Sequence, residues 1–87
     1  MKVKSDFIIH NRENESLLVS TGASDFNGLV RGNKTFGDIV GLMEEDTTED
    51  RIVASMLERY DDATEEQVRR DVVRVITELR GIGALDE

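Results

Sequence analysis

The sequence predicts an α+β fold in which a three-stranded antiparallel sheet is followed by three helices. Three observations lead to this class. Short β-prone runs separated by turn-rich segments fill residues 1–32, and the apolar spacing becomes helical from residue 33 onward. The last two helical segments are joined by a short turn. We therefore expect one winged helix-turn-helix domain over residues 1–87, with strands within 1–32 and helices within 33–87.

The strands are predicted from three short runs of β-prone residues. Phe7–Ile9 and Leu17–Val19 are apolar runs separated by a polar stretch. Phe26 and Leu29-Val30-Arg31 form the third run, on either side of a turn dipeptide, and Gly32 ends it. A short strand at the edge of a sheet, beside helices, is a place where another chain can dock.

The helices are predicted from their caps and their apolar stripes. Asn33 stands where the first helix should begin, and Thr47 or Thr48 opens the second. Thr64–Gln67 has the pattern of a capping box for the third helix, and Gly81 is the residue expected just beyond its end. The expected core positions are Phe36, Ile39, Val40 and Met43, then Ile52, Val53, Met56, Leu57 and Tyr60, then Val68, Val72, Val75, Ile76 and Leu79.

Composition excludes several classes of protein. The chain has no cysteine, which rules out disulfides and thiolate metal sites, and no apolar run reaches the ~20 residues of a membrane span. No signal-peptide pattern opens the sequence, so we expect a cytoplasmic protein and no membrane partner. Residues 1–37 carry five basic and four acidic residues, whereas residues 38–87 carry six basic and fifteen acidic ones, which gives the net charge of −8. This acidity disfavours nucleic acid as a partner.

The sequence shows no organised catalytic constellation. His10 is the single histidine, and a nucleophilic or metal site would have to use it. A small hydrolase or metal enzyme built on His10 is one alternative, but an exposed strand or turn residue explains His10 more simply. The glycines of Gly28–Gly32 lack the spacing of phosphate-binding loops. We therefore expect no enzymatic activity, no metal site and no cofactor.

The third helix carries a second stripe beside its core positions. Its residues follow steps of four, three and four and combine apolar with basic character: Arg69, Val73, Ile76 and Arg80. An apolar strip flanked by arginines suits an amphipathic, acidic peptide. The alternative for the arginines of this helix is pairing within it, for example of Glu66 with Arg70 or of Arg74 with Glu78.

The ordered set of these features resembles the pyrroloquinoline quinone biosynthesis protein D-like (PqqD-like) family, also called the RiPP recognition element. The matching segments run nearly from end to end: Phe7–Val19, Asp25–Val30, Asn33–Thr35, Phe36–Met43, Thr47–Val53, Leu57–Asp61, Asp71–Leu79 and Gly81–Leu85. One departure is Gly32, which stands where relatives usually carry an apolar residue. This departure could loosen the end of the third strand.

The resemblance implies a non-catalytic adaptor that binds the leader of a ribosomally made precursor peptide. In that family the leader adds a strand to the edge of the third strand, here Leu29, Val30 and Arg31, and lies against the third helix. The domain then presents the peptide to a modifying enzyme, commonly a radical SAM maturase. The helical contribution would come from the stripe of Arg69, Val73, Ile76 and Arg80, which we assign from its spacing.

Two further expectations stay open at the level of sequence. A DNA-binding winged helix is the alternative function, because the arginines of the third helix could contact phosphates. Strand exchange through the open edge could also make a homodimer.

Overall fold

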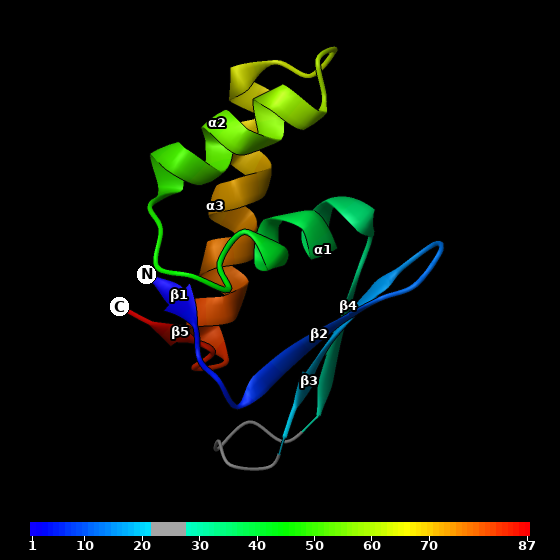
Figure 1. Cartoon of the computed structure of the whole chain (residues 1–87), viewed down its shortest axis with the longest axis vertical. Helices are drawn as coiled ribbons and strands as arrows, with labels where there is room; N and C mark the ends of the chain where they lie inside the picture. The colour runs from blue at the N-terminus through cyan, green and yellow to red at the C-terminus, as the bar shows by residue number, and fades with distance from the viewer. Residues whose placement is uncertain (22–27) are drawn as a thin grey trace.

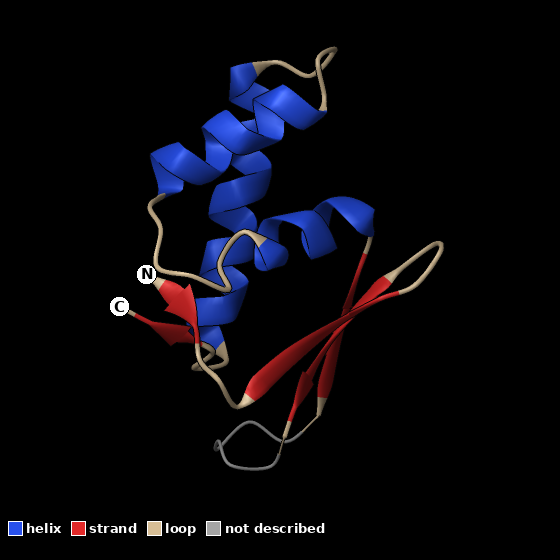
Figure 2. Cartoon of the chain, in the orientation of Figure 1, coloured by secondary structure: helices blue, strands red, loops and turns tan. Residues whose placement is uncertain are grey.

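The computed structural model describes residues 1–21 and 28–87, and it confirms the α+β class. A three-stranded antiparallel sheet packs against three helices in a winged helix-turn-helix arrangement (Figure 1). The elements are β1 (Lys2–Val3), β2 (Phe7–Asn11), β3 (Ser16–Ser20), β4 (Leu29–Gly32), α1 (Lys34–Gly41), α2 (Glu49–Arg59), α3 (Glu65–Gly81) and β5 (Leu85–Asp86). Figure 2 shows the helices gathered at one end and the sheet projecting from the other.

The larger sheet has the strand order β2-β3-β4, so β3 is central and β4 lies at an edge. Ile9, Leu18 and Val30 form one cross-strand row, and all three side chains contact the core. Strands were expected at these three places. In the structure the first of these strands continues beyond Ile9 and ends at Asn11, and the third strand covers Leu29–Gly32. Phe26, assigned to the third run from the sequence, lies outside the described residues.

All three helices begin where the sequence predicted. Asn33 accepts a hydrogen bond from the Phe36 amide at 2.9 Å, and Thr48 caps α2. Thr64 and Gln67 form the expected capping box, in which each side chain accepts a hydrogen bond from the backbone amide of the other residue. Because these caps satisfy amides that have no partner inside the helix, they fix where α1, α2 and α3 start.

The end of α3 differs from the prediction. Gly81 belongs to the helix. Ile82 is the C-cap, and Gly83 after it has the left-handed backbone conformation, with φ of 72°. The Ala84 amide donates to the Leu79 carbonyl at 2.9 Å and the Gly83 amide to the Arg80 carbonyl at 3.2 Å, which together make a Schellman motif. This turn leads the chain into β5.

A second, two-stranded sheet was not predicted. β1 pairs with β5 in antiparallel register, with Val3 opposite Leu85, so the two ends of the described chain lie side by side (Figure 1). Two-residue strands are too short to give a periodic pattern in the sequence, which explains why this sheet was not anticipated. No helix in the described ranges is long and apolar enough to cross a membrane.

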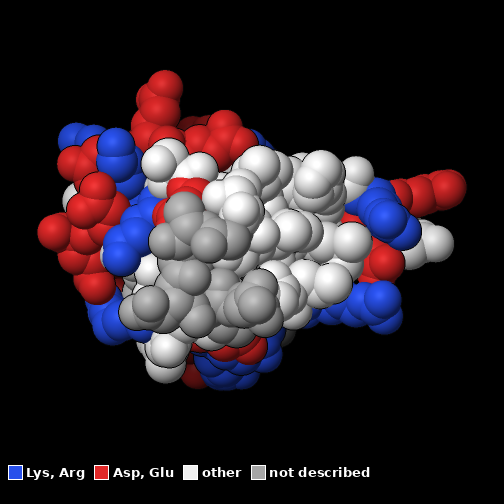
Figure 3. Space-filling view, turned by 90° about the horizontal axis from the view of Figure 1, so that it is seen from below, with Lys and Arg blue, Asp and Glu red and all other residues white. Residues whose placement is uncertain are grey.

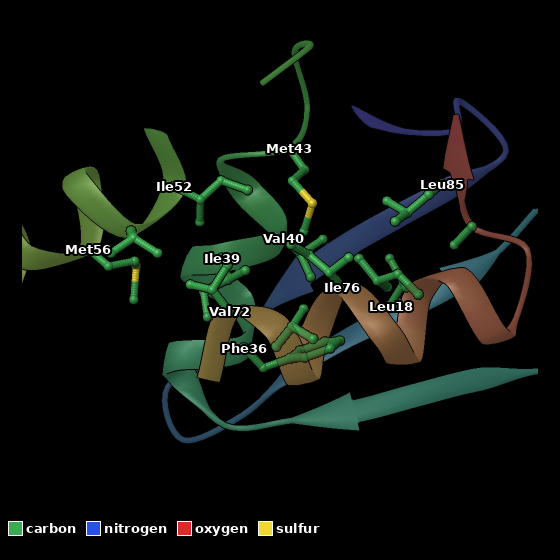
Figure 4. Packing of buried hydrophobic residues seen from close by; sticks show 14 of the residues in the cluster. Leu18, Phe36, Ile39, Val40, Met43, Ile52, Met56, Val72, Ile76 and Leu85 are labelled. Carbon is green, nitrogen blue, oxygen red and sulfur yellow. The ribbon is translucent and has the colours of Figure 1, made fainter. Parts of the chain in front are cut away.

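The core lies between the three helices and the inner face of the sheet (Figure 4). The predicted helical stripes supply most of it, because the period of 3.6 places each set on one face. The buried apolar residues are Phe7, Leu18, Phe36, Ile39, Val40, Met43, Ile52, Val53, Met56, Val68, Val72, Val75, Ile76, Leu79, Ala84 and Leu85. Burial of this cluster holds α3 at a fixed distance from the sheet, and therefore from the β4 edge.

Candidate functional site

The backbone hydrogen bonds of β3 alternate between its two neighbours. On the β2 side, the Thr21 amide donates to the Asp6 carbonyl at 2.8 Å and the Arg12 amide donates to the Glu15 carbonyl at 2.7 Å. In an antiparallel ladder, hydrogen-bonded pairs alternate with pairs that are not bonded. The even-numbered residues of β2 therefore form backbone hydrogen bonds with the odd-numbered residues of β3, such as Leu17.

The even-numbered residues of β3 face β4 by the same rule, and the Ser20 amide donates to the Gly28 carbonyl at 3.4 Å. Val30 and Gly32, which lie opposite Leu18 and Ser16, direct their backbone groups toward β3. The amides and carbonyls of Leu29 and Arg31 consequently point away from the sheet. Within the described ranges no strand pairs with that side of β4. The edge thus presents two donors and two acceptors to solvent.

The side chains of β4 alternate as well. Leu29 is 51% exposed and the Arg31 side chain 73% exposed, and both lie on the outer face of the sheet. Val30 lies on the inner face and contacts the core. The structure therefore places the three predicted strand residues together at one open edge, with two of them outward and one inward.

A groove separates this edge from α3. It has a volume of about 200 Å³, and Figure 4 shows β4 running beside α3. We call it the β4–α3 groove. One side is lined by Arg31, Gly32, Asn33, Thr35, Phe36 and Ile39, and the α3 side is lined by Asp71, Arg74, Val75 and Glu78.

Phe36, which lines the groove, leaves no room for a side chain at position 32. A Cβ atom at position 32 would lie 2.3–2.5 Å from atoms of the Phe36 side chain, far inside van der Waals contact. The ring of Phe36 is buried against the backbone of β4. Gly32 still pairs with Ser16, so its departure from the usual family pattern does not detach the end of β4.

The charges along the groove are mixed. Arg74 pairs with Asp71 at 3.2 Å, and Arg31 lies 3.8 Å from Glu15 across the outer face. Glu78 adds a further carboxylate to the α3 side. Exposed pairs of this kind contribute little net energy, so the groove offers no strong field of one sign to a ligand.

The predicted helical stripe lies on the other flank of α3. Residues two apart on a helix point about 160° away from each other, so Val73 faces away from Asp71 and Arg80 away from Glu78. Val73, Ile76 and Arg80 line a separate hollow of about 400 Å³. The other residues of that hollow are Met1, Thr47, Thr48, Glu49, Thr77 and Glu87.

The structure therefore does not bring that stripe to the β4 edge. Ile76 is 5% exposed and belongs to the core, whereas Val73 is 42% exposed. Arg69 forms ion pairs with Glu49 at 2.7 Å and Asp50 at 3.0 Å, which join α3 to the start of α2. The α3 residues beside β4 are the set at positions 71, 74, 75 and 78, which sequence reasoning did not select. Their helical spacing was visible, but spacing does not reveal which flank faces the sheet.

The family model described as "Coenzyme PQQ synthesis protein D (PqqD)" matches residues 17–85 of the chain. The chain belongs to the PqqD family. It is also similar to a solved structure described as "TbiB1 in Complex with the TbiA(beta) Leader Peptide". The TM-score is 0.78 and the sequence identity is 19%, over 99% of this chain and 95% of that chain. At this identity the likeness establishes a shared fold. The curated proteins include no match.

The basic residues of α3 are all paired in this PqqD-family chain. Besides Arg69 and Arg74, Arg70 pairs with Glu66 at 3.2 Å, as predicted, and Arg80 pairs with Glu87 at 2.6 Å. Arg74 pairs with Asp71 and not with Glu78, the partner named in the alternative interpretation. Hydrogen bonding between Arg80 and Glu87 raises the pKa of the arginine and lowers that of the carboxylate.

These pairs weaken the case for the DNA-binding alternative, because every arginine of α3 already has an acidic neighbour. DNA affinity depends on basic side chains that are available to neutralise phosphates. On the described part of the face shown in Figure 3, basic and acidic side chains are intermixed at both ends, with an uncharged area between them. The structure thus gives no support to a phosphate-binding surface along α3.

His10 lies on the outer face of β2, opposite Leu17, and is exposed. The described residues contain no group of three or more histidine, cysteine or acidic side chains arranged to hold a metal ion. The placement of His10 is that of an exposed strand residue, which was the simpler interpretation of the sequence.

Proposed function

We propose that this PqqD-family chain is a non-catalytic adaptor that binds the leader of a ribosomally made precursor peptide by strand addition at β4. The observation that carries the proposal is the direction of the Leu29 and Arg31 backbone groups. Their amides and carbonyls point out of the sheet, and Arg31 also lines the β4–α3 groove. An extended peptide satisfies such groups by forming a further strand, and its alternate side chains enter the neighbouring groove.

The similar fold of TbiB1, described in complex with a leader peptide, supports the same kind of ligand. We propose a peptide-modifying enzyme, of radical SAM type, as the second partner, and the cytoplasm as the place of action. In this arrangement the edge strand supplies sequence-tolerant affinity, and the groove supplies selectivity. Dimerisation by strand exchange through β4 would use the same backbone groups, so it would compete with the peptide.

An NMR titration with hydrogen exchange tests the proposal. The probe is a synthetic leader peptide from a precursor gene next to the gene of this protein. We expect the amides of Leu29 and Arg31 to shift and to become protected from exchange, because they gain hydrogen-bond acceptors. The Val30 amide already bonds within the sheet, so its protection should change much less. If the Leu29 and Arg31 amides are unaffected by a large excess of peptide, strand addition at β4 is wrong.

A further inference from the structure

The outer face of the larger sheet carries an apolar cluster that the core does not use. Ile8 lies opposite Val19, and Val19 lies opposite Leu29, so these three side chains form one row across β2, β3 and β4. Leu17 lies beside the row, two residues before Val19 on the same face of β3. We call these four residues the outer patch. None of the four belongs to the core cluster, and Ile8 and Leu29 are 47% and 51% exposed.

This apolar character is unusual for a sheet face that is turned to solvent. An antiparallel sheet with one solvated face normally alternates apolar and polar residues along each strand. Here β2 contains the run Phe7–Ile9 and β3 the run Leu17–Val19, so both faces of each strand are apolar. Of the three exposed large apolar residues in the described ranges, two lie in the outer patch and the third is Val73 on α3. Isolated exposed apolar residues are ordinary, whereas a contiguous cluster indicates an interaction surface.

Arg31 gives the outer patch a charged border. It lies on the same face as Leu29, and its Nε is 3.8 Å from the Glu15 carboxylate, which is beyond hydrogen-bonding distance. Figure 3 views the molecule from below, where the sheet projects in Figure 1, and on its described part an uncharged area separates two charged ends. The outer patch therefore suits a protein surface that presents apolar side chains and a carboxylate opposite Arg31.

A peptide strand bound at β4 would extend the outer patch. Side chains alternate along a strand, so one set of peptide side chains faces the β4–α3 groove and the other stands on the outer face beside Leu29 and Arg31. The row from Ile8 to Leu29 thus gains a further member from the peptide. A protein that covers this face touches the chain and its peptide together, whereas a protein bound at the hollow around Val73, on the opposite flank of α3, does not.

We propose that the peptide-modifying enzyme docks on the outer patch together with the outward side chains of the bound peptide. This inference rests on the proposed function and assigns a surface to its second partner. The most exposed side chains of the outer patch are about half exposed, so the four offer far less than the ~800 Å² that each partner buries in a stable interface. A permanent dimer therefore does not fit this surface. Because the peptide completes it, the enzyme binds the loaded chain more tightly than the empty one, and by linkage it strengthens peptide binding by the same factor.

Cross-saturation NMR tests the surface in the unmodified protein. The probe is the peptide-modifying enzyme encoded next to the gene of this protein, added with the leader peptide to a deuterated chain that carries 13C-labelled isoleucine methyl groups. Ile8 lies in the outer patch, Ile76 lines the hollow on the opposite flank of α3, and Ile52 is a buried core residue. We expect strong attenuation of the Ile8 signal and little of the other two. Attenuation at Ile76 without Ile8, or at none of the three, would overturn the inference.

Two matched substitutions measure the contribution of the outer patch. Ile8→Ser and Val73→Ser each remove an exposed β-branched side chain, the first from the outer patch and the second from the opposite flank of α3. We expect Ile8→Ser to weaken binding of the enzyme to the loaded chain roughly tenfold, and Val73→Ser to change it by less than about twofold. Ile8 belongs to β2, which lies at the other edge of the sheet from β4, so the peptide affinity of the chain alone should be unchanged in both variants.

The results separate the two proposals. If the peptide protects the Leu29 and Arg31 amides but enzyme binding does not distinguish Ile8→Ser from Val73→Ser, the docking surface is refuted and the adaptor function stands. If the peptide does not protect those amides, the adaptor function itself fails. A second copy of the chain is the competing occupant of the outer patch. A wild-type dimer in sedimentation that Ile8→Ser dissociates and the enzyme does not displace would also overturn the inference.

Discussion

Replacing Arg31 with proline should weaken peptide binding while leaving the fold intact. Proline has no amide hydrogen, so the substitution deletes one of the two outward donors of β4. The Arg31 amide makes no bond to β3, because Leu17 and Arg31 form a pair that is not hydrogen bonded. Proline is tolerated at edge strands when its nitrogen faces away from the sheet. We therefore expect the free energy of unfolding to change by less than about 1 kcal/mol.

The expected loss of affinity follows from the lost hydrogen bond. One such bond contributes about 0.5–1.5 kcal/mol, and leaving the peptide carbonyl buried without a donor costs about 1–3 kcal/mol. The second cost applies here, because proline leaves the peptide carbonyl without a donor, and a loss of about 1–3 kcal/mol corresponds to a dissociation constant raised roughly 5-fold to 150-fold. The steric bulk of the proline ring at the edge acts in the same direction.

Isothermal titration calorimetry with the leader peptide and urea unfolding measure the two quantities on the same samples. Arg31→Ala is the matched control, since it removes the charged side chain and keeps the amide. Val30→Pro is the opposite control. The Val30 amide faces Leu18 of β3 and bonds within the sheet, so we expect its loss in Val30→Pro to destabilise the fold by about 1–3 kcal/mol. The reasoning is refuted if Arg31→Pro binds the peptide as tightly as Arg31→Ala, or if it destabilises the fold as much as Val30→Pro.

Two further predictions concern contacts made by α1, through Phe36 and Asp38. Gly32→Ala should lower the free energy of unfolding by about 1–3 kcal/mol, because the new Cβ would collide with Phe36. Gly41→Ala is the control and should be neutral or stabilising, since nothing lies within 4 Å of its new Cβ. Equal effects of the two substitutions in urea unfolding would contradict this reasoning. Tyr60 is the single tyrosine, and its hydrogen bond to Asp38 raises its pKa above the ordinary value near 10. An absorbance titration at alkaline pH should show this raised midpoint and its return toward the ordinary value in Asp38→Asn. The stability that this bond contributes should be complete below pH ~10 and disappear as the pH rises through the raised pKa; an ordinary midpoint in the wild type would argue against the bond.

Local chemistry in the sequence was sufficient for most of the helical architecture. Asn33 and Thr64 have side chains that cap amides a few residues away, so their signals do not depend on distant parts of the chain. The end of α3 was harder to predict. Gly81 and Gly83 are both glycines near the end of the apolar stripe, and only the hydrogen bond from Ala84 to Leu79 selects Gly83 as the left-handed residue.

The sequence by itself determined the three strands of the larger sheet, the helix starts, the core stripes and the family of this protein, because each depends on residues close together in the chain or on their order. The tertiary structure decided which parts of the site face one another. Periodicity shows that α3 has two flanks beside its core face, but the packing of α1 and the sheet determines which flank meets β4. That packing places Val75 beside the open edge and turns Val73 away from it. The direction of the Leu29 and Arg31 amides likewise depends on strand register, which only the paired sheet fixes.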